Sequence, residues 1–204
     1  MIFYAISDRR LEAGGSLFRQ LDKYLRLGAD WIQLREKDLS DRELLEAAGA
    51  ASRKAEKTGA KVIVNGRADI ASLSGAAGVQ LPSDSPPVEK IKAAFPGLTV
   101  IKSCHTLEDV RRAEAAGADL VTVGPVFETP SKKGIIEPMG LSALSDICSA
   151  CNIPVIALGG IGTGQAGQVA DAGACGIAGI RLFNDPEAEE EDGFRAGIEA
   201  LKKR

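Results

Sequence analysis

Short apolar runs alternate along the chain with segments of helical spacing. The apolar runs predict strands over 2–6, 30–34, 61–64, 78–81, 99–103, 120–126, 154–158 and 175–181. Apolar residues at helical intervals predict helices over 15–27, 40–57, 68–74, 87–94, 106–116, 141–149 and 163–172, and from 186 onward. Ser40 and Thr106 precede two of these helices as N-cap residues. The chain is therefore a regular succession of strands and helices.

This succession contains eight strand–helix units, the number that closes a parallel barrel. Gly-Ala pairs stand before several strands, where the glycine ends a helix and a small residue allows close packing: Gly28-Ala29, Gly59-Ala60, Gly117-Ala118 and Gly173-Ala174. A doubly wound open sheet is the alternative, but no G-x-G-x-x-G follows the first strand. We predict an α/β protein with one domain over residues 1–204, a single (β/α)8 TIM barrel.

The composition narrows the class of protein. A net charge of −3 and a single tryptophan argue against a nucleic-acid surface, which needs a basic face and stacking aromatic residues. The sequence has no run of about 18 apolar residues, so we expect no membrane span. The first residues enter a strand pattern directly, without the basic region and cleavage site of a signal peptide. We expect a cytoplasmic protein.

Four cysteines raise the question of metal or redox chemistry. Cys148 and Cys151 form a lone C-x-x-C, and the other two are Cys104 and Cys175. A zinc site would need a second pair, and His105 is the only imidazole in the chain. We predict reduced, structural thiols, with redox chemistry as the alternative.

One stretch, residues 119–140, joins a predicted buried strand to a polar loop. It reads DLVTVGPVFETPSKKGIIEPMG. Its second half carries side chains that suit the binding of a small anion, namely Glu128, Thr129, Ser131, Lys132 and Lys133. A solvated basic loop is the alternative, and this stretch alone does not decide between them.

The predicted barrel locates the functional residues, because catalytic groups belong at the C-terminal ends of its strands. Nearly every such end is polar, whereas the opposite joints are built from small residues. The polar ends comprise Ser7, Asp8, Gln33, Arg35, Lys37, Asn65, Arg67, Gln80, Ser83, Asp84, Ser103, His105, Glu128, Lys132, Gly159, Gly160 and Arg181. This asymmetry predicts an active site at that end of the barrel.

Two strand ends predict a phosphate ligand. Gly159-Gly160-Ile161-Gly162 ends the seventh strand and opens a helix, where backbone N–H groups can approach an anion. Arg181 ends the eighth strand, and its guanidinium can bind phosphate through two hydrogen bonds. We therefore expect the partner to be a small phosphorylated molecule.

Eight segments together resemble the thiamin phosphate synthase and TenI family along nearly the whole chain. They are YAISD (4–8), QLREKD (33–38), VNGRADIA (64–71), GVQLPSD (78–84), KSCH (102–105), GPVFETPSKKG (124–134), ALGGI (157–161) and AGACGIA (172–178). The resemblance implies a (β/α)8 barrel. It also implies that the chain is an enzyme of thiamin biosynthesis. The synthase branch of this family joins a pyrimidine diphosphate to a thiazole phosphate and releases pyrophosphate.

The resemblance assigns binding roles residue by residue. Positions that hold the pyrimidine diphosphate in the family correspond to Gln33, Arg35, Lys37, Asn65, Ser103 and Lys132. Positions around the thiazole phosphate correspond to Thr129, Pro130, Ser131, Gly160, Ile180 and Arg181. A homodimer is a further implication of the resemblance.

The departures from the synthase pattern concern magnesium. Gly66 and Ser85 stand where the synthases have magnesium-binding aspartates, and Gln80-Leu81-Pro82-Ser83 replaces a His-x-Gly-Gln. Magnesium needs carboxylate or phosphate oxygens, so we expect no metal and no cofactor. Magnesium is expected as a cofactor only if the chain is a synthase. Asn-Gly-Arg, V-Q-L-P-S and F-E-T-x-x-K-K-G resemble the TenI branch instead, and Arg67 could supply fixed positive charge where the metal was.

The expected activity is therefore a metal-independent proton transfer of the thiazole tautomerase type, an isomerase reaction. Pro125 stands where that pattern has its proton-carrying histidine, so His105, Glu128, Lys132 or Cys104 would act as acid or base. Each has an alternative role: His105 in capping or packing, and Glu128 as an ion-pair partner of Lys132. A thiamin phosphate synthase, a transferase, is the alternative function, and a non-catalytic phosphate binder is a second one.

Overall fold

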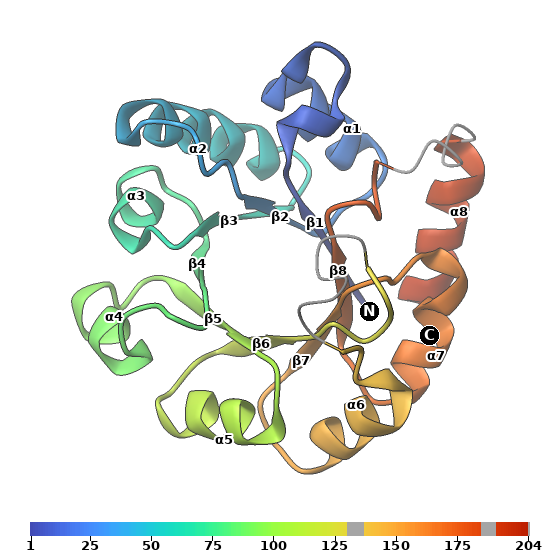
Figure 1. The fold of residues 1–204 in the computed structure, drawn as a ribbon. Helices are drawn as coiled ribbons and strands as arrows, with labels where there is room; N and C mark the ends of the chain where they lie inside the picture. The colour runs from blue at the N-terminus through green and yellow to red at the C-terminus, as the bar shows by residue number, and fades with distance from the viewer. Residues whose placement is uncertain (130–136, 185–190, 204) are drawn as a thin grey trace.

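The computed structural model describes residues 1–129, 137–184 and 191–203. Within them, eight parallel strands close into a barrel in the order of the sequence, which confirms the predicted fold (Figure 1). The strands are β1 (Ile2–Ile6), β2 (Trp31–Leu34), β3 (Lys61–Asn65), β4 (Gly78–Leu81), β5 (Thr99–Cys104), β6 (Leu120–Val123), β7 (Val155–Leu158) and β8 (Gly176–Gly179).

Helices surround the barrel and cover its outer surface (Figure 1). They are α1 (Leu17–Arg26), α2 (Asp41–Glu56), α3 (Ala68–Leu73), α4 (Val88–Ala94), α5 (Leu107–Ala115), α6 (Gly140–Ser149), α7 (Ala166–Asp171) and α8 (Glu191–Lys202), with short 3-10 turns η1 (Arg9–Leu11), η2 (Ala13–Gly15) and η3 (Thr163–Gln165). In the described part of the chain, none of these helices has both the length and the apolar surface to cross a membrane.

Two predicted helix caps are confirmed. The Ser40 hydroxyl accepts a hydrogen bond from the Glu43 N–H at the start of α2, and the Glu43 carboxylate accepts one from the Ser40 N–H. Thr106 and Asp109 form the same reciprocal pair at the start of α5. Both pairs satisfy N–H groups that the first helical turn leaves without partners.

Some predicted bounds are wrong. The sixth strand ends at Val123 instead of residue 126, because Pro125 has no N–H to extend the strand pairing. The chain nevertheless continues alongside β7, since the Val126 N–H donates to the Leu158 carbonyl oxygen at 2.9 Å. The eighth strand is shorter than 175–181, and the helix predicted over 163–172 begins as the 3-10 turn η3.

The side chains of the strands point alternately into and out of the barrel. Ile63, Ile101 and Ile156 belong to the apolar cluster inside the barrel, together with Tyr4 and Trp31. The residues of opposite parity pack between the strands and the helices. Near the C-terminal ends of β2 to β6 the inward-facing residues are polar, so they form a layer above the apolar interior there.

The four cysteines are free, in agreement with the prediction of reduced thiols. Burial raises the pKa of Cys148 to about 11 and that of Cys104 to about 12. These thiols are therefore almost entirely protonated at neutral pH, which disfavours nucleophilic or redox chemistry.

We expect iodoacetamide at pH 8 to alkylate Cys148 about 100-fold, and Cys104 about 1000-fold, more slowly than a free thiol of ordinary pKa, because only the thiolate reacts. Peptide mass spectrometry of the native protein measures the rates, and the urea-unfolded protein is the control. Rapid native labelling, or a Cys148–Cys151 disulfide in the purified protein, would contradict this expectation.

Candidate active site

A layer of hydrogen-bonded polar side chains lies at the C-terminal ends of the central strands. The Gln33 side-chain amide donates to Asn65 Oδ1 at 3.3 Å, which joins β2 to β3. Gln80 Nε2 donates to Ser103 Oγ at 3.0 Å and to Thr122 Oγ1 at 3.1 Å, which joins β4 to β5 and β6. The structure thus brings together Gln33 and Asn65, both predicted site residues, and Gln80 forms a hydrogen-bonded support for Ser103.

Two members of this layer were not among the predicted site residues. Tyr4 donates from its hydroxyl to Gln80 Oε1 at 3.4 Å, and Thr122 accepts from Gln80. Burial raises the pKa of Tyr4, so its hydroxyl stays protonated and remains a donor. Strand parity was the available signal, because Tyr4, Gln80 and Thr122 all occupy inward-facing positions.

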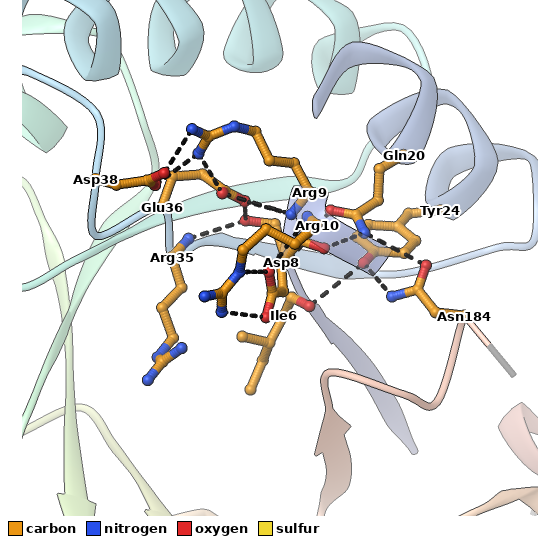
Figure 2. Close-up of polar contacts among 11 residues, drawn as sticks. Ile6, Asp8, Arg9, Arg10, Gln20, Tyr24, Arg35, Glu36, Asp38 and Asn184 are labelled. Carbon is orange, nitrogen blue, oxygen red and sulfur yellow. Dashed lines mark hydrogen bonds and ion pairs between the residues drawn. The ribbon is translucent and has the colours of Figure 1, made fainter. Parts of the chain in front are cut away.

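Arg35, directly after β2, is held by its backbone while its side chain is free. The Arg35 N–H donates to Ser7 Oγ at 3.0 Å, and Ser7 in turn donates to the Glu36 carboxylate at 2.6 Å. Figure 2 shows the Arg35 guanidinium directed away from this group of contacts. Among the described residues, the Arg35 and Lys37 side chains have no hydrogen-bond or ion-pair partner.

The neighbouring carboxylates are already neutralised by a different arginine. The Arg9 guanidinium binds Glu36 at 2.8 Å and makes two hydrogen bonds of 2.8 Å to Asp38 (Figure 2). The Glu36 side chain is only 3% exposed. The ion pair with Arg9 therefore neutralises a buried negative charge close to Arg35. The positive charges of Arg35 and Lys37 therefore remain available for an anion.

Arg67 differs from these cations. Its guanidinium binds Asp69 at 2.7 Å and also binds Asp41 at the start of α2. The adjacent guanidinium holds the pKa of Asp69 below its usual range. Because two carboxylates already neutralise Arg67, the structure gives it an evident role in joining α2 to α3.

The loop after β6 packs tightly on the loop after β7. The Phe127 N–H donates to the Gly159 carbonyl oxygen at 3.0 Å. Gly160 has a φ of +64°, and a Cβ atom there would lie 2.4 Å from the Glu128 carbonyl oxygen. Only glycine fits this position. The same contact brings the exposed Glu128 and its neighbour Thr129 beside the β7 end, whereas the predicted site residues Ser131 and Lys132 lie outside the described residues.

His105 lies after β5 with its ring against the β6 loop. Its Nδ1 is 2.5 Å from the Gly124 carbonyl oxygen. A carbonyl oxygen only accepts, so Nδ1 carries the proton and the neutral ring has its lone pair on Nε2. The His105 backbone N–H also donates to Asp109 at 3.1 Å. The packing and capping role that the sequence left open is therefore present, and in the neutral tautomer Nε2 is an acceptor.

The end of β8 presents a different combination of groups. The Ile180 side chain packs against the apolar interior of the barrel, and Arg181 is exposed. Within residues 1–129, 137–184 and 191–203, the Arg181 side chain has no hydrogen-bond or ion-pair partner. Gly160 and Arg181 thus stand on the adjacent strand ends β7 and β8.

A protein-held magnesium ion does not fit the residues at the ends of β3 and β4. Gly66 has no side chain, and the Ser85 hydroxyl lies 2.8 Å from the Lys102 ammonium. Lys102 also donates to the carbonyl oxygens of Pro82 at 2.6 Å and Ser83 at 3.1 Å. An ammonium at this loop repels a second cation, and a hydroxyl is a weaker magnesium ligand than a carboxylate.

A family profile matches most of the chain. The profile described as thiamine monophosphate synthase covers residues 3–183. Apart from Ile2 at the start of β1, that range includes all eight strands of the barrel and every described candidate residue named above.

Individual relatives and solved structures agree with the profile. The chain is 41% identical over 180 residues to putative thiamine-phosphate synthase 2 of Aquifex aeolicus, an overlap of 88% of this chain and 96% of the relative. It is 38% identical over 191 residues to the thiamine-phosphate synthase of Roseiflexus sp. strain RS-1, an overlap of 92% and 81%. The solved thiamine phosphate pyrophosphorylase from Pyrococcus furiosus superposes with a TM-score of 0.86 at 31% identity, covering 98% of this chain and 96% of that one.

Proposed function

The chain belongs to the thiamine monophosphate synthase family, as its sequence predicted, and we propose that it couples a pyrimidine diphosphate to a thiazole phosphate. In this reaction the bond between the pyrimidine-bearing carbon and the diphosphate oxygen breaks. Its electron pair leaves with pyrophosphate, and the lone pair of the thiazole nitrogen forms the new bond to that carbon, which leaves the ring positively charged. The names of the relatives support this transferase reaction.

The proposal rests on one observation: carboxylates neutralise some of the cationic side chains near the strand ends and leave others without a partner among the described residues. The Arg9 and Arg67 side chains are neutralised by carboxylates. In the described residues, the Arg35, Lys37 and Arg181 side chains have no such partner. Arg35 and Lys37 follow β2, beside the Gln33–Asn65 pair, whereas Arg181 follows β8 beside Gly160. Two anionic groups can therefore bind on either side of β1.

In this arrangement Arg35 and Lys37 bind the diphosphate and neutralise charge that grows on the leaving pyrophosphate. Gly160 and Arg181 bind the phosphate of the thiazole, which orients that ring toward the reacting carbon. Gln33, Asn65 and Ser103, on β2, β3 and β5, hydrogen-bond to the pyrimidine diphosphate. The hydrogen bond between Gln33 and Asn65, and the one that Gln80 donates to Ser103, preorganise these side chains for this role.

The proton-transfer reaction expected from the TenI-like segments is not supported by the comparisons, because the relatives are named as synthases. One feature still favours it as a second candidate. The His105 tautomer leaves the Nε2 lone pair able to accept a proton, and Gly124 fixes the ring. This second candidate takes a related phosphorylated thiazole, a thiazole carboxylate phosphate, as its ligand.

A two-substrate assay tests the proposed function. Pyrophosphate release is measured with pyrimidine diphosphate and thiazole phosphate together and with each alone, in magnesium chloride and in EDTA. We expect release only when both substrates are present. Absence of release in both buffers overturns the proposal, and conversion of a thiazole carboxylate phosphate tautomer under those conditions would establish the second candidate instead.

A further inference from the structure

Asn184 lies beyond the end of β8 and makes a set of buried contacts that the proposed reaction does not use directly. Its Nδ2 donates to the Ile180 carbonyl oxygen at 2.7 Å and to the Tyr24 hydroxyl at 2.8 Å. Its Oδ1 accepts from Gln20 Nε2 at 3.4 Å. Gln20 and Tyr24 belong to α1 and are fully buried. Figure 2 shows Asn184 facing both of them.

These contacts fix the orientation of one peptide group. In a trans peptide the C=O and the following N–H point in opposite directions. The Ile180 carbonyl points to Asn184, so the Arg181 N–H points away from it. Asn184 lies on the β1 side of β8, because its partner Tyr24 donates to the Ile6 carbonyl oxygen of β1 at 3.3 Å. The Arg181 N–H therefore faces the β7 side.

The same peptide geometry directs the Gly160 N–H, after β7, toward the space between β7 and β8. The Gly159 carbonyl oxygen accepts from the Phe127 N–H, which lies on the β6 side of β7. The following Gly160 N–H therefore points to the β8 side. Within the described residues, neither the Gly160 N–H nor the Arg181 N–H has a hydrogen-bond partner. Two N–H donors thus face the space between β7 and β8, an arrangement that binds anions.

We propose that Asn184 is a positioning residue for phosphate, which holds the Ile180–Arg181 peptide so that the Arg181 N–H faces the anion. This inference rests on the proposed function, which places the thiazole phosphate between β7 and β8. The side-chain amide suits the role because it offers two donor hydrogens and one acceptor, and all three are used here. A carboxylate of the same shape would have no hydrogen to donate to the Ile180 carbonyl.

The chain offers a matched control. Asn184→Ala removes the hydrogen bond to Ile180, whereas Tyr24→Phe breaks the same buried network but keeps that bond. We expect Asn184→Ala to raise the KM for thiazole phosphate about tenfold, the effect of one hydrogen bond to a charged group. The KM for pyrimidine diphosphate should stay within about twofold, because its site follows β2. Tyr24→Phe should lower the Tm with both KM values close to wild type.

A measurement on the wild-type protein covers the case in which Asn184→Ala does not fold. Titration with inorganic phosphate should move the backbone amide resonances of Gly160 and Arg181 in NMR spectra, and no movement of Arg181 overturns the inference. Equal KM changes for both substrates in Asn184→Ala, or an unchanged KM for thiazole phosphate, also overturn it. The phosphate titration needs no turnover. It therefore tests the role of Asn184 even if the two-substrate assay shows no synthase reaction.

Discussion

Replacing Arg35 with glutamine is expected to lower kcat/KM for the pyrimidine diphosphate by on the order of 10²- to 10³-fold, the usual effect of losing a charge that stabilises a leaving group. The side chain makes no hydrogen bond or ion pair with the described residues, so the fold should not depend on it. Only its backbone N–H is used, in the contact to Ser7. Steady-state kinetics with pyrophosphate detection measures the loss.

The matched control is Arg195→Gln on α8. Arg195 is 60% exposed and pairs with Glu199 one helical turn away, so its removal changes the net charge equally without touching the strand ends. We expect this variant to keep wild-type kcat/KM, and both variants to melt within a few degrees of wild type. An Arg35→Gln enzyme with wild-type kcat/KM would refute the assignment of the diphosphate site.

The second large effect is expected for Gly160→Ala. The new Cβ would lie 2.4 Å from the Glu128 carbonyl oxygen, and φ at this residue is +64°. Strain and overpacking together should cost roughly 2–4 kcal/mol of unfolding free energy. The β6 and β7 loops must separate to relieve the contact, so affinity for thiazole phosphate should fall with stability. Differential scanning calorimetry and thiazole phosphate titration measure the two effects.

Gly164→Ala is the control for this substitution. Gly164 lies four residues further on, in η3, and a Cβ there would meet nothing within 4 Å. The same chemical change should therefore leave both stability and affinity nearly unchanged. If Gly160→Ala behaves like Gly164→Ala, the close approach of the two loops does not shape the site.

The periodicity of the sequence predicted the barrel and the strand ends, because both follow from local patterns. Gln33, Asn65 and Ser103 could be placed at one end of the barrel from their positions within predicted strands. Which of them touch could not be predicted, since this depends on the register between neighbouring strands. The pairing of Gln33 with Asn65 is one example, because 32 positions separate them in the chain.

The charged groups were harder to assign. Arg67 and Arg35 both follow strands and look equivalent in the sequence. Their difference comes from carboxylates that the fold supplies, since Asp41 is 26 positions away from Arg67. Similarly, the Lys102 ammonium at Ser85 depends on a contact between strand β5 and the loop after β4. A sequence pattern shows that a cation is present, but only the fold shows whether it is already neutralised.

The two-layer interior of the barrel has a consequence for how such a protein can change. The isoleucines and the ring of Tyr4 fill the lower interior, and the Tyr4 hydroxyl reaches Gln80 in the upper one. Gln33, Asn65 and Ser103 also line the upper layer. Substitutions in the upper layer therefore alter ligand chemistry with little effect on the packing beneath. A descendant of this chain could acquire a new substrate by exchanging a few upper-layer side chains, which makes the scaffold a practical starting point for laboratory evolution.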